Sequence, residues 1–316
     1  MLDPATVSRY SAGLALLSAW LSMVSGRPSV TQLVELQARP LVGWLEQFVE
    51  EKYSDGELRS TVVDCILGLL KEAWWLRHSL TPIWRLLGNW QLREPMECRR
   101  PMPPVVLLSM ITVAITWGMP RFAVGLWTAF HGLLRPGELF SMVRGSVIFC
   151  SSLGYSGAQA AGAVLAIPFP KTRKYGPRRQ HVMVLDWDLV AIMEVIFGHL
   201  DPAENLLPYT DATARSRFAK ILERIGIPGH MYSWASLRAG GATFDYLSGT
   251  PVAAIKFRGR WAAEKTLEHY IQECTAALDM AALPALIQRR CHALSRFAPT
   301  LLNGLLHGNS CNKNTG

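Results

Sequence analysis

The sequence lacks the cysteine and histidine patterns from which metal sites and disulfide frameworks are built. Its six cysteines are scattered through 316 residues without a Cys-x-x-Cys pair, and no His-Glu-x-x-His segment occurs. These absences argue against a zinc enzyme and against a small secreted protein held together by disulfides. We therefore expect no metal ion, and we expect buried or incidental thiols in a reducing compartment.

Charged residues are also scarce, because they make up only 18% of the chain, and the acidic residues are the fewer. The 32 lysines and arginines exceed the 24 aspartates and glutamates, which gives a net charge of +8 and a pI near 9.3. A hydrophobic fraction of 50% excludes general disorder. A positive excess carried by few charges favours a polyanionic partner such as nucleic acid, although basic ribosomal and membrane-surface proteins share this balance.

Neither of the two long apolar runs is a clear targeting or membrane-spanning segment. Residues 13–24 follow Arg9 as a signal-peptide core would, but Asp3 also precedes them and favours a first amphipathic helix. Residues 103–120 are uncharged, yet they contain serine and threonine, and prolines bound them at a length just short of a membrane span. The second run therefore predicts a buried core helix.

Helical periodicity dominates the chain on both sides of a proline-rich break. In residues 1–93, apolar positions recur at spacings of three and four, which predicts a small helical domain. Residues 94–103, within the segment REPMECRRPMPP, interrupt every periodicity with prolines and charges and predict a linker. Helices are expected again at about 104–118 and 120–131.

Three short segments that follow predict β-strands. GSVIFC, GAVLAIPF and QHVMVLD contain β-branched residues and are separated by glycine-rich or basic turns, which is typical of a small antiparallel sheet. The expected fold class is mainly α with one small antiparallel β-sheet (α+β). A mixed domain would span residues 104–285, and residues 286–316 would form a C-terminal helix and a disordered tail.

Two arginines occupy positions that a ligand could reach. Arg135 in GLLRPGEL enters a predicted turn, and Glu138 can hold its guanidinium, although such a pair is commonly a local contact worth about 0.2–0.5 kcal/mol. Arg238 lies near the start of a helix that Ser233 caps and Gly249 closes. The neighbouring AGGAT segment removes side-chain bulk, so that either a ligand or another backbone can approach closely.

The segment KTRKYGPRRQH, residues 171–181, is strongly basic and contains no acidic residue. Its five lysines and arginines are Lys171, Arg173, Lys174, Arg178 and Arg179. The segment is either a solvated hairpin tip or a basic finger that contacts phosphates or bases. A lysine here could also protonate a leaving oxygen, and Lys171 and Lys174 are rival candidates because one sequence does not fix the register of a hairpin.

The segment FRGRWAAEKTLEHYIQE combines arginines with a tryptophan and a tyrosine. Arg258 and Arg260 are candidate DNA contacts beside Trp261, at the end of a short helix. Tyr270 is expected two turns into the helix that follows. A protonated phenol is a poor nucleophile, and nearby guanidiniums would favour the phenolate that attacks phosphorus. The alternative is an ordinary tyrosine whose ring packs and whose hydroxyl stays in water.

Five of these residues together supply the groups that a tyrosine needs to attack a phosphodiester. They are Arg135, Lys171, Arg238, Trp261 and Tyr270. The two guanidiniums would bind the non-bridging oxygens, which gain charge in the transition state, and the lysine would protonate the leaving 5′ oxygen. In this order and spacing, the five residues resemble those of the tyrosine recombinases, or phage-type integrases.

The resemblance rests on short motifs within roughly residues 104–285. GLLRPGEL matches the family's Gly-Leu-Arg-x-x-Glu-Leu turn with one extra leucine, and Lys171 matches the lysine of its strand-turn Lys-Thr. ASLRAGGAT matches the family's His-x-Leu-Arg and the small-residue helix after it. Trp261 lies nine residues before Tyr270, as the family's histidine or tryptophan does, although Arg260 separates it from the preceding glycine.

The resemblance implies a helical core-binding domain at residues 1–93 and an integrase-like catalytic domain at residues 104–285, which close around double-stranded DNA. It implies site-specific DNA recombination or integration, as by the integrase of a mobile element, through a 3′-phosphotyrosyl link to Tyr270. Trp261 would orient the phosphate-binding groups. Because the link keeps the bond energy, no metal, ATP or other cofactor is expected.

The resemblance also implies partners and a compartment. A homo-tetramer on paired DNA sites is expected, with residues 281–294 as an apolar helix that docks on a neighbouring subunit. The protein would be intracellular with access to DNA, in the nucleus of a eukaryote or the cytoplasm of a bacterium, and no membrane partner is expected.

One position departs from the family's pattern. Ala235 stands where the family has a histidine, three residues before Arg238, and the loss of such a donor typically slows catalysis by about a hundred- to a thousand-fold. Ser233 or Ser236 could replace it in part. The alternatives are therefore a DNA-binding relative with weakened catalysis, and a basic helical scaffold protein unrelated to recombination.

Overall fold

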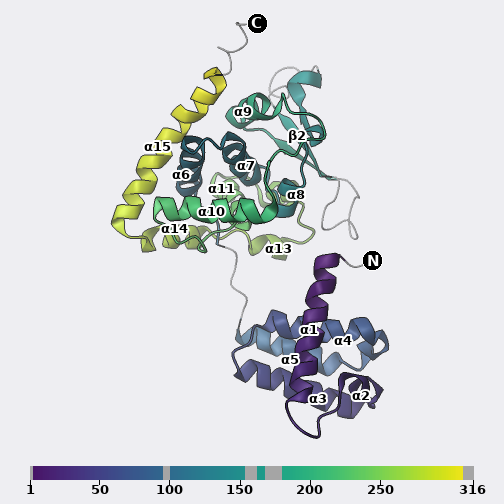
Figure 1. The fold of residues 1–316 in the computed structure, drawn as a ribbon. Coiled ribbons are helices and arrows are strands. Elements are labelled where there is room, and N and C mark those ends of the chain that lie inside the picture. The colour runs from purple at the N-terminus through teal and green to yellow at the C-terminus, as the bar shows by residue number, and fades with distance from the viewer. Residues whose placement is uncertain (1–2, 95–99, 154–161, 168–179, 309–316) are drawn as a thin grey trace. The chain divides into compact units, whose positions relative to one another are not determined.

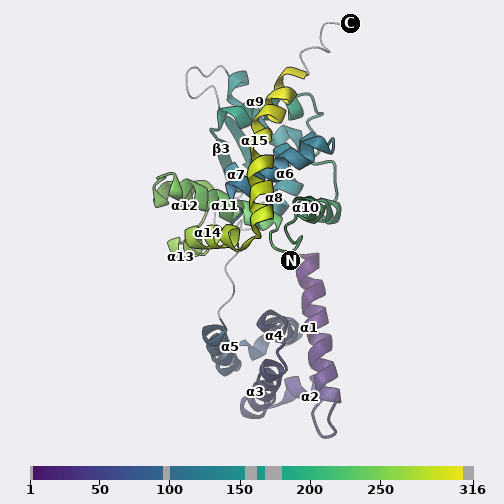
Figure 2. The same ribbon diagram turned by 90° about the vertical axis from the view of Figure 1, so that its left-hand side faces the viewer.

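The computed structural model describes residues 3–94, 100–153, 162–167 and 180–308. The chain divides into two compact units, Met1–Glu97 and Cys98–Gly316, and each unit has a hydrophobic core of its own (Figures 1 and 2). Among these described residues, no helix is long and apolar enough to cross a membrane. The expected fold class, mainly α with one small antiparallel sheet, is confirmed.

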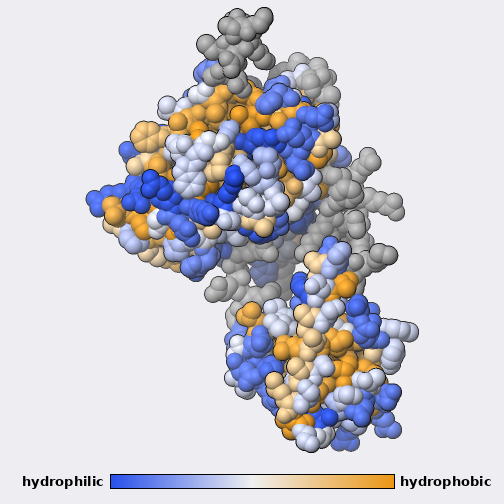
Figure 3. Space-filling model, in the orientation of Figure 1, coloured by the Kyte–Doolittle hydropathy of each residue, from blue (hydrophilic) through white to orange (hydrophobic). Residues whose placement is uncertain are grey.

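The N-terminal unit consists of helices that pack around a shared core. They are α1 (Pro4–Ser22), α2 (Val30–Glu35), α3 (Ala38–Ser54), α4 (Arg59–Glu72), the 3-10 helix η1 (Trp74–His78) and α5 (Thr81–Arg93). Helices α1 and α4 approach closely because Gly13 has no side chain, and a Cβ atom there would lie 2.6 Å from the carbonyl carbon of Asp64. Hydrophobic side chains also reach the surface in the region of α1 and α4 (Figure 3).

The C-terminal unit is larger and surrounds a small sheet with helices. Its α-helices are α6 (Pro104–Thr116), α7 (Pro120–His131), α8 (Pro136–Phe140), α9 (Trp187–Phe197), α10 (Asp211–Ile225), α11 (Trp234–Leu247), α12 (Val252–Gly259), α13 (Glu264–Glu268), α14 (Glu273–Ala282) and α15 (Ala285–Gly308). The 3-10 helices η2 (Arg144–Ser146) and η3 (Cys150–Leu153) flank the first strand.

The sheet of this unit has three antiparallel strands in the order β1-β2-β3. They are β1 (Val147–Phe149), β2 (Ala163–Ile167) and β3 (Gln180–Val184). Leu165 in the middle strand pairs with Val147 on one side and with Val182 on the other, and all three are buried. The three β-branched segments of the sequence therefore form one sheet, whose buried side chains join the main core of the unit.

Helix α6 is the buried core helix that the uncharged run 103–120 predicts. The long helix α15 lies along it (Figure 1), and the hydroxyls of α6 are used at this contact. Ser109 Oγ donates to the Cys291 carbonyl at 2.8 Å, and Thr112 Oγ1 donates to the Leu294 carbonyl at 2.9 Å. Polar residues are therefore tolerated inside the core because each hydroxyl has a carbonyl partner.

The segment 281–294, expected as one apolar helix, is divided between two helices. Helix α14 ends at Ala282 and α15 begins at Ala285, after Pro284. Proline favours this break because it lacks an N–H group and disfavours helical backbone in the residue before it. Helix α15 buries Cys291 in the core of its own unit and leaves Leu286 exposed.

Two glycines in the middle of α11 allow this helix to touch its neighbours. A Cβ atom at Gly241 would overlap the carbonyl oxygen of Phe130 in α7, and one at Gly240 would overlap the carbonyl oxygen of Met102. The small residues of AGGAT therefore admit another part of the backbone. This contact fixes α11, the helix that carries Arg238, against α7, which leads to Arg135.

We expect Gly241→Ala to lower the free energy of unfolding of the C-terminal unit by about 1–3 kcal/mol, because the added methyl group overpacks the contact with α7. Gly304→Ala is the matched control: Gly304 lies in α15, and a Cβ atom there meets nothing within 4 Å. That change should raise stability by up to about 1 kcal/mol through helix propensity. Urea unfolding of both variants measures the difference, and equal effects would contradict the close contact.

Candidate phosphodiester-binding site

The turn between α7 and α8 holds Arg135 by two contacts with one carboxylate. Glu138 Oε1 accepts a hydrogen bond from Arg135 Nη1 at 2.8 Å, and Glu138 Oε2 accepts one from the Arg135 backbone N–H at 2.9 Å. Pro136 starts α8 directly after Arg135, where its missing N–H costs nothing. The Arg135 side chain is 20% exposed, so its guanidinium is fixed and still accessible.

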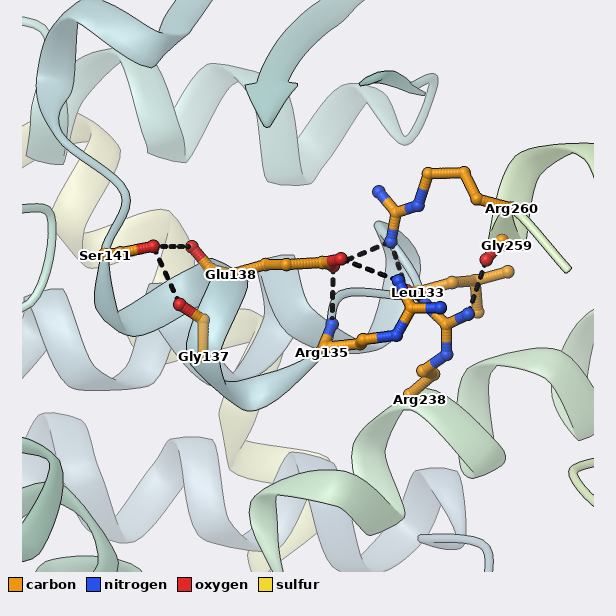
Figure 4. A network of polar contacts seen from close by, with 8 residues as sticks. All are labelled: Leu133, Arg135, Gly137, Glu138, Ser141, Arg238, Gly259 and Arg260. Atoms are coloured by element: carbon orange, nitrogen blue, oxygen red, sulfur yellow. Dashed lines mark hydrogen bonds and ion pairs between the residues drawn. The ribbon is translucent and has the colours of Figure 1, made fainter. Parts of the chain in front are cut away.

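Arg238 is buried and joins three separate segments. It projects from α11 and is only 2% exposed. Its Nη1 donates to the carbonyl oxygen of Leu133, in the α7–α8 turn, and its Nη2 donates to the carbonyl oxygen of Gly259, at the end of α12 (Figure 4). The guanidinium therefore sets the distance between the Arg135 turn and the segment that leads to Trp261.

Trp261 forms one wall of the site. Its ring centroid lies 4.2 Å from the guanidinium carbon of Arg238, within the range of a cation–π contact. Gly259 allows the chain to fold over this ring, because a Cβ atom there would overlap Trp261. Arg260, between the two, has φ of 59°, in the left-handed region that residues other than glycine rarely adopt. This left-handed residue ends α12 and turns the chain towards Trp261.

Tyr270 lies beside both aromatic and guanidinium groups, but it is not inside a helix. Its ring centroid is 5.0 Å from that of Trp261 and 5.5 Å from the guanidinium carbon of Arg238. The prediction that Tyr270 lies two turns into a helix is wrong, because α13 ends at Glu268 and Tyr270 follows in the turn before α14. Tyr270, the candidate nucleophile, is therefore held in a turn between two short helices.

Thr243 holds this turn, and the sequence analysis missed it. Its Oγ1 donates to the Tyr270 carbonyl at 3.1 Å and accepts from the Gln272 N–H at 3.1 Å. The side chain is 3% exposed, in α11. The only signal in the sequence is the threonine that ends the segment AGGAT, and spacing alone does not link it to a residue 27 positions away.

Glu138 also binds Arg260, which places a third guanidinium at the site. Arg260 Nη2 donates to Glu138 Oε2 at 2.8 Å and to the Leu133 carbonyl at 3.1 Å (Figure 4). Both partners of this ion pair are nearly buried, with side chains 7% and 4% exposed. Arg260, expected from the sequence as a DNA contact, thus also binds Glu138, which no local sequence pattern indicates. Arg258, the other candidate in this segment, pairs with Asp245.

The candidate site carries more positive than negative charge. Among the described residues, Glu138 is the one carboxylate in an ion pair with Arg135, Arg238 or Arg260. Burial, together with the charges of Arg135 and Arg260, lowers the pKa of Arg238 to about 9. Burial likewise lowers the pKa of Arg260 to about 10. An anion bound between these groups would offset the repulsion.

The remaining candidate residues are the basic ones between β2 and β3 and those at the start of α11. Lys171, Arg173, Lys174, Arg178 and Arg179 lie outside the described residues, in the connection from β2 to β3. Ala235 lies in the first turn of α11 and brings no polar side-chain atom to the site. The Ser236 hydroxyl accepts from the Ser233 N–H at 3.1 Å, so it serves the start of the helix.

No protein-family model and no curated protein matches this sequence. Two solved structures of the XerH site-specific recombinase are similar to the chain. In the pre-cleavage complex with difH substrate, the TM-score is 0.53 with 13% identity over 88% of this chain and 78% of that chain. In the post-cleavage complex with palindromic difH substrate, the TM-score is 0.55 with 13% identity over 87% and 78%. The chain has a tyrosine recombinase fold.

This tyrosine recombinase fold confirms the expected resemblance at the level of architecture. Within it, four of the five expected residues meet: Arg135, Arg238, Trp261 and Tyr270 come from four segments and lie around one cluster. Across the described ranges, no three His, Cys, Asp or Glu side chains lie close enough together to hold a metal ion.

We expect Thr243→Val to loosen the turn that carries Tyr270, because valine keeps the shape of the side chain but leaves a carbonyl and an N–H group without partners. Hydrogen exchange by mass spectrometry should then show faster exchange in residues 268–273 than in the wild type. Thr243→Ser is the control, since it keeps the hydroxyl and should exchange as the wild type does. Identical exchange in both variants would mean that Thr243 does not hold the turn.

Proposed function

We propose that this chain binds double-stranded DNA and recombines it by strand cleavage and rejoining through Tyr270. The observation that carries the proposal is the convergence of Arg135, Arg238 and Arg260 on one buried cluster, with the Tyr270 ring 5.5 Å from the Arg238 guanidinium. A cluster of positive charge beside a tyrosine fits a phosphodiester, because phosphate binds guanidiniums with paired hydrogen bonds. The likeness in fold to XerH, a site-specific recombinase solved with its difH substrate, supports this substrate class.

The reaction exchanges one phosphodiester for another. Tyr270 Oη forms a bond to phosphorus and releases its proton to water, the bond from phosphorus to the 5′ oxygen breaks, and that oxygen gains a proton. Lys171 or Lys174 is the proposed donor of that proton. Attack by the 5′ hydroxyl of a second strand on the 3′-phosphotyrosyl link then restores a phosphodiester. The guanidiniums stabilise the charge that grows on the non-bridging oxygens.

Trp261 has a supporting role in this proposal. Its ring covers one face of the Arg238 guanidinium at 4.2 Å and also packs against the Tyr270 ring. It therefore aligns the group that would bind phosphate with the group that would attack it, and such alignment is worth a large part of a reaction barrier.

The N-terminal unit offers a second contact with DNA. A pocket of about 750 Å³ on its surface has a mixed lining of basic, aromatic and aliphatic side chains: Lys71, Arg77, His78, Tyr10, Trp74, Trp84, Leu67 and Leu70. Basic and aromatic side chains together are typical of surfaces that bind nucleic acid. We propose that this unit helps to grip the duplex, that four copies assemble on paired sites, and that the protein works in a compartment with access to DNA.

Tyr270→Phe should abolish covalent attachment to DNA without abolishing binding. The substrate is a pool of duplexes of randomised sequence, each with a nick that lets a short 5′-hydroxyl fragment leave after cleavage. The wild type should form an adduct that survives a denaturing gel, whereas the phenylalanine variant should form none because it has no oxygen to attack phosphorus. Its salt-sensitive binding in a native gel should equal that of the wild type.

The same assay separates the remaining interpretations. Adduct formation by the wild type that survives Tyr270→Phe would refute the role of this tyrosine. Salt-sensitive binding without any adduct would indicate a relative with weakened catalysis. No binding to DNA would leave a basic helical scaffold protein.

The second candidate function, DNA binding with weakened catalysis, is favoured by one observation: Ala235 supplies no donor in the first turn of α11. Ala235→His adds a donor three residues before Arg238, and we expect it to raise the rate of adduct formation by up to about a hundredfold. Ala235→Leu is the control for added bulk and should not raise the rate. If histidine gives no increase over leucine, the site already has the donors that it needs.

A further inference from the structure

We propose that Arg260 is a positioning residue of the phosphate site, which shares Glu138 with Arg135 and thereby keeps the site positively charged for an anion. The inference rests on the proposed function, because the anion is the phosphate that Tyr270 would attack. It differs from a role as an ordinary DNA contact, since the Arg260 side chain is only 7% exposed and is paired with Glu138.

The charge balance is the first reason. Arg135, Arg238 and Arg260 carry three positive charges, and Glu138 carries one negative charge, so the cluster holds two positive charges in excess. Without Arg260, Glu138 would neutralise Arg135 and only Arg238 would remain in excess. The second excess charge would attract an anion strongly, because charges interact more strongly in a largely buried cluster, where the effective dielectric constant is low.

The hydrogen bonds of Glu138 are the second reason. Its Oε2 accepts both from Arg260 Nη2 and from the Arg135 backbone N–H, while its Oε1 accepts from Arg135 Nη1 (Figure 4). Arg260 thus adds a contact to the carboxylate from a segment 122 positions away in the sequence, beside the two contacts that Arg135 makes. If Arg260 were removed, the carboxylate would keep its two contacts with Arg135 and lose the one that ties both residues to the segment after α12.

The third reason is that Arg260 has hydrogen-bond donors that no described residue accepts from. Its Nε and Nη1 are buried and have no hydrogen-bond partner among the residues that the structure describes. Arg238 Nε is in the same position. Buried donors without partners are rare in folded proteins, and a ligand that accepts hydrogen bonds is a common explanation.

Inorganic phosphate is the probe that tests this inference without any cleavage. The melting temperature of the full chain should rise in phosphate compared with chloride at equal ionic strength, because a bound anion stabilises the folded state. Arg260→Gln should lose most of this phosphate-dependent rise, and Arg260→Lys should keep more of it because lysine retains the charge. Arg215→Gln, which removes an exposed arginine paired with Asp211, should keep the full rise.

The outcomes separate a charge at the site from a structural contact. A structural role alone would lower the melting temperature of Arg260→Gln equally in phosphate and in chloride, which would overturn the inference. The absence of a phosphate-dependent rise in the wild type would overturn it too. If the rise and its loss are both observed but no DNA adduct forms, the inference about the anion site stands and the proposed recombination fails.

Where adducts form, a neutral substrate adds a readout that folding does not influence. Replacing the scissile phosphate by a methylphosphonate removes its negative charge. Arg260→Gln should slow attack on the phosphodiester by about a hundredfold, as expected for a lost electrostatic contact, and slow attack on the methylphosphonate much less. An equal loss on both substrates would assign Arg260 to the framework alone.

Discussion

The burial of the Arg238 guanidinium is the constraint on which the rest of the site depends. A charge removed from water must be compensated by hydrogen bonds and by other charges. Two backbone carbonyls, those of Leu133 and Gly259, and the face of Trp261 provide that compensation. Because these groups belong to segments distant in sequence, satisfying one side chain aligns the α7–α8 turn, α11 and the end of α12.

These groups compensate the buried charge of Arg238 only in part, because the pKa of its guanidinium is still lowered. An arginine whose pKa is lowered to about 9 is harder to protonate in the folded state than in the unfolded one, so its charge destabilises the fold at any pH below that value. The penalty is full below about pH 9, falls gradually as the pH rises from there towards the ordinary pKa of arginine, and is offset when an anion enters. A protein tolerates such a penalty most often where function requires it, since sites for charged ligands are seldom optimal for stability.

Local sequence signals predicted most of the architecture and only part of the site. The three β-branched segments, the uncharged helix α6 and the capping residue Ser233 follow from periodicity and turn residues, which act over a few positions. The Tyr270 turn was missed because Leu267, Tyr270 and Ile271 have helical spacing, while the hydrogen bonds of the distant Thr243 hydroxyl decide the backbone. Likewise, no local pattern reveals that Leu133 and Gly259 offer their carbonyls to Arg238.

The pairing of α6 with α15 has a consequence for how the C-terminal unit is made. Ser109 and Cys291 are 182 residues apart, and their hydrogen bond joins the first helix of the unit to the last. On the ribosome, α6 would emerge long before α15, so the face of α6 that α15 covers would stay uncovered for much of synthesis. A nascent chain that already contains every residue of the arginine cluster would still lack a closed core.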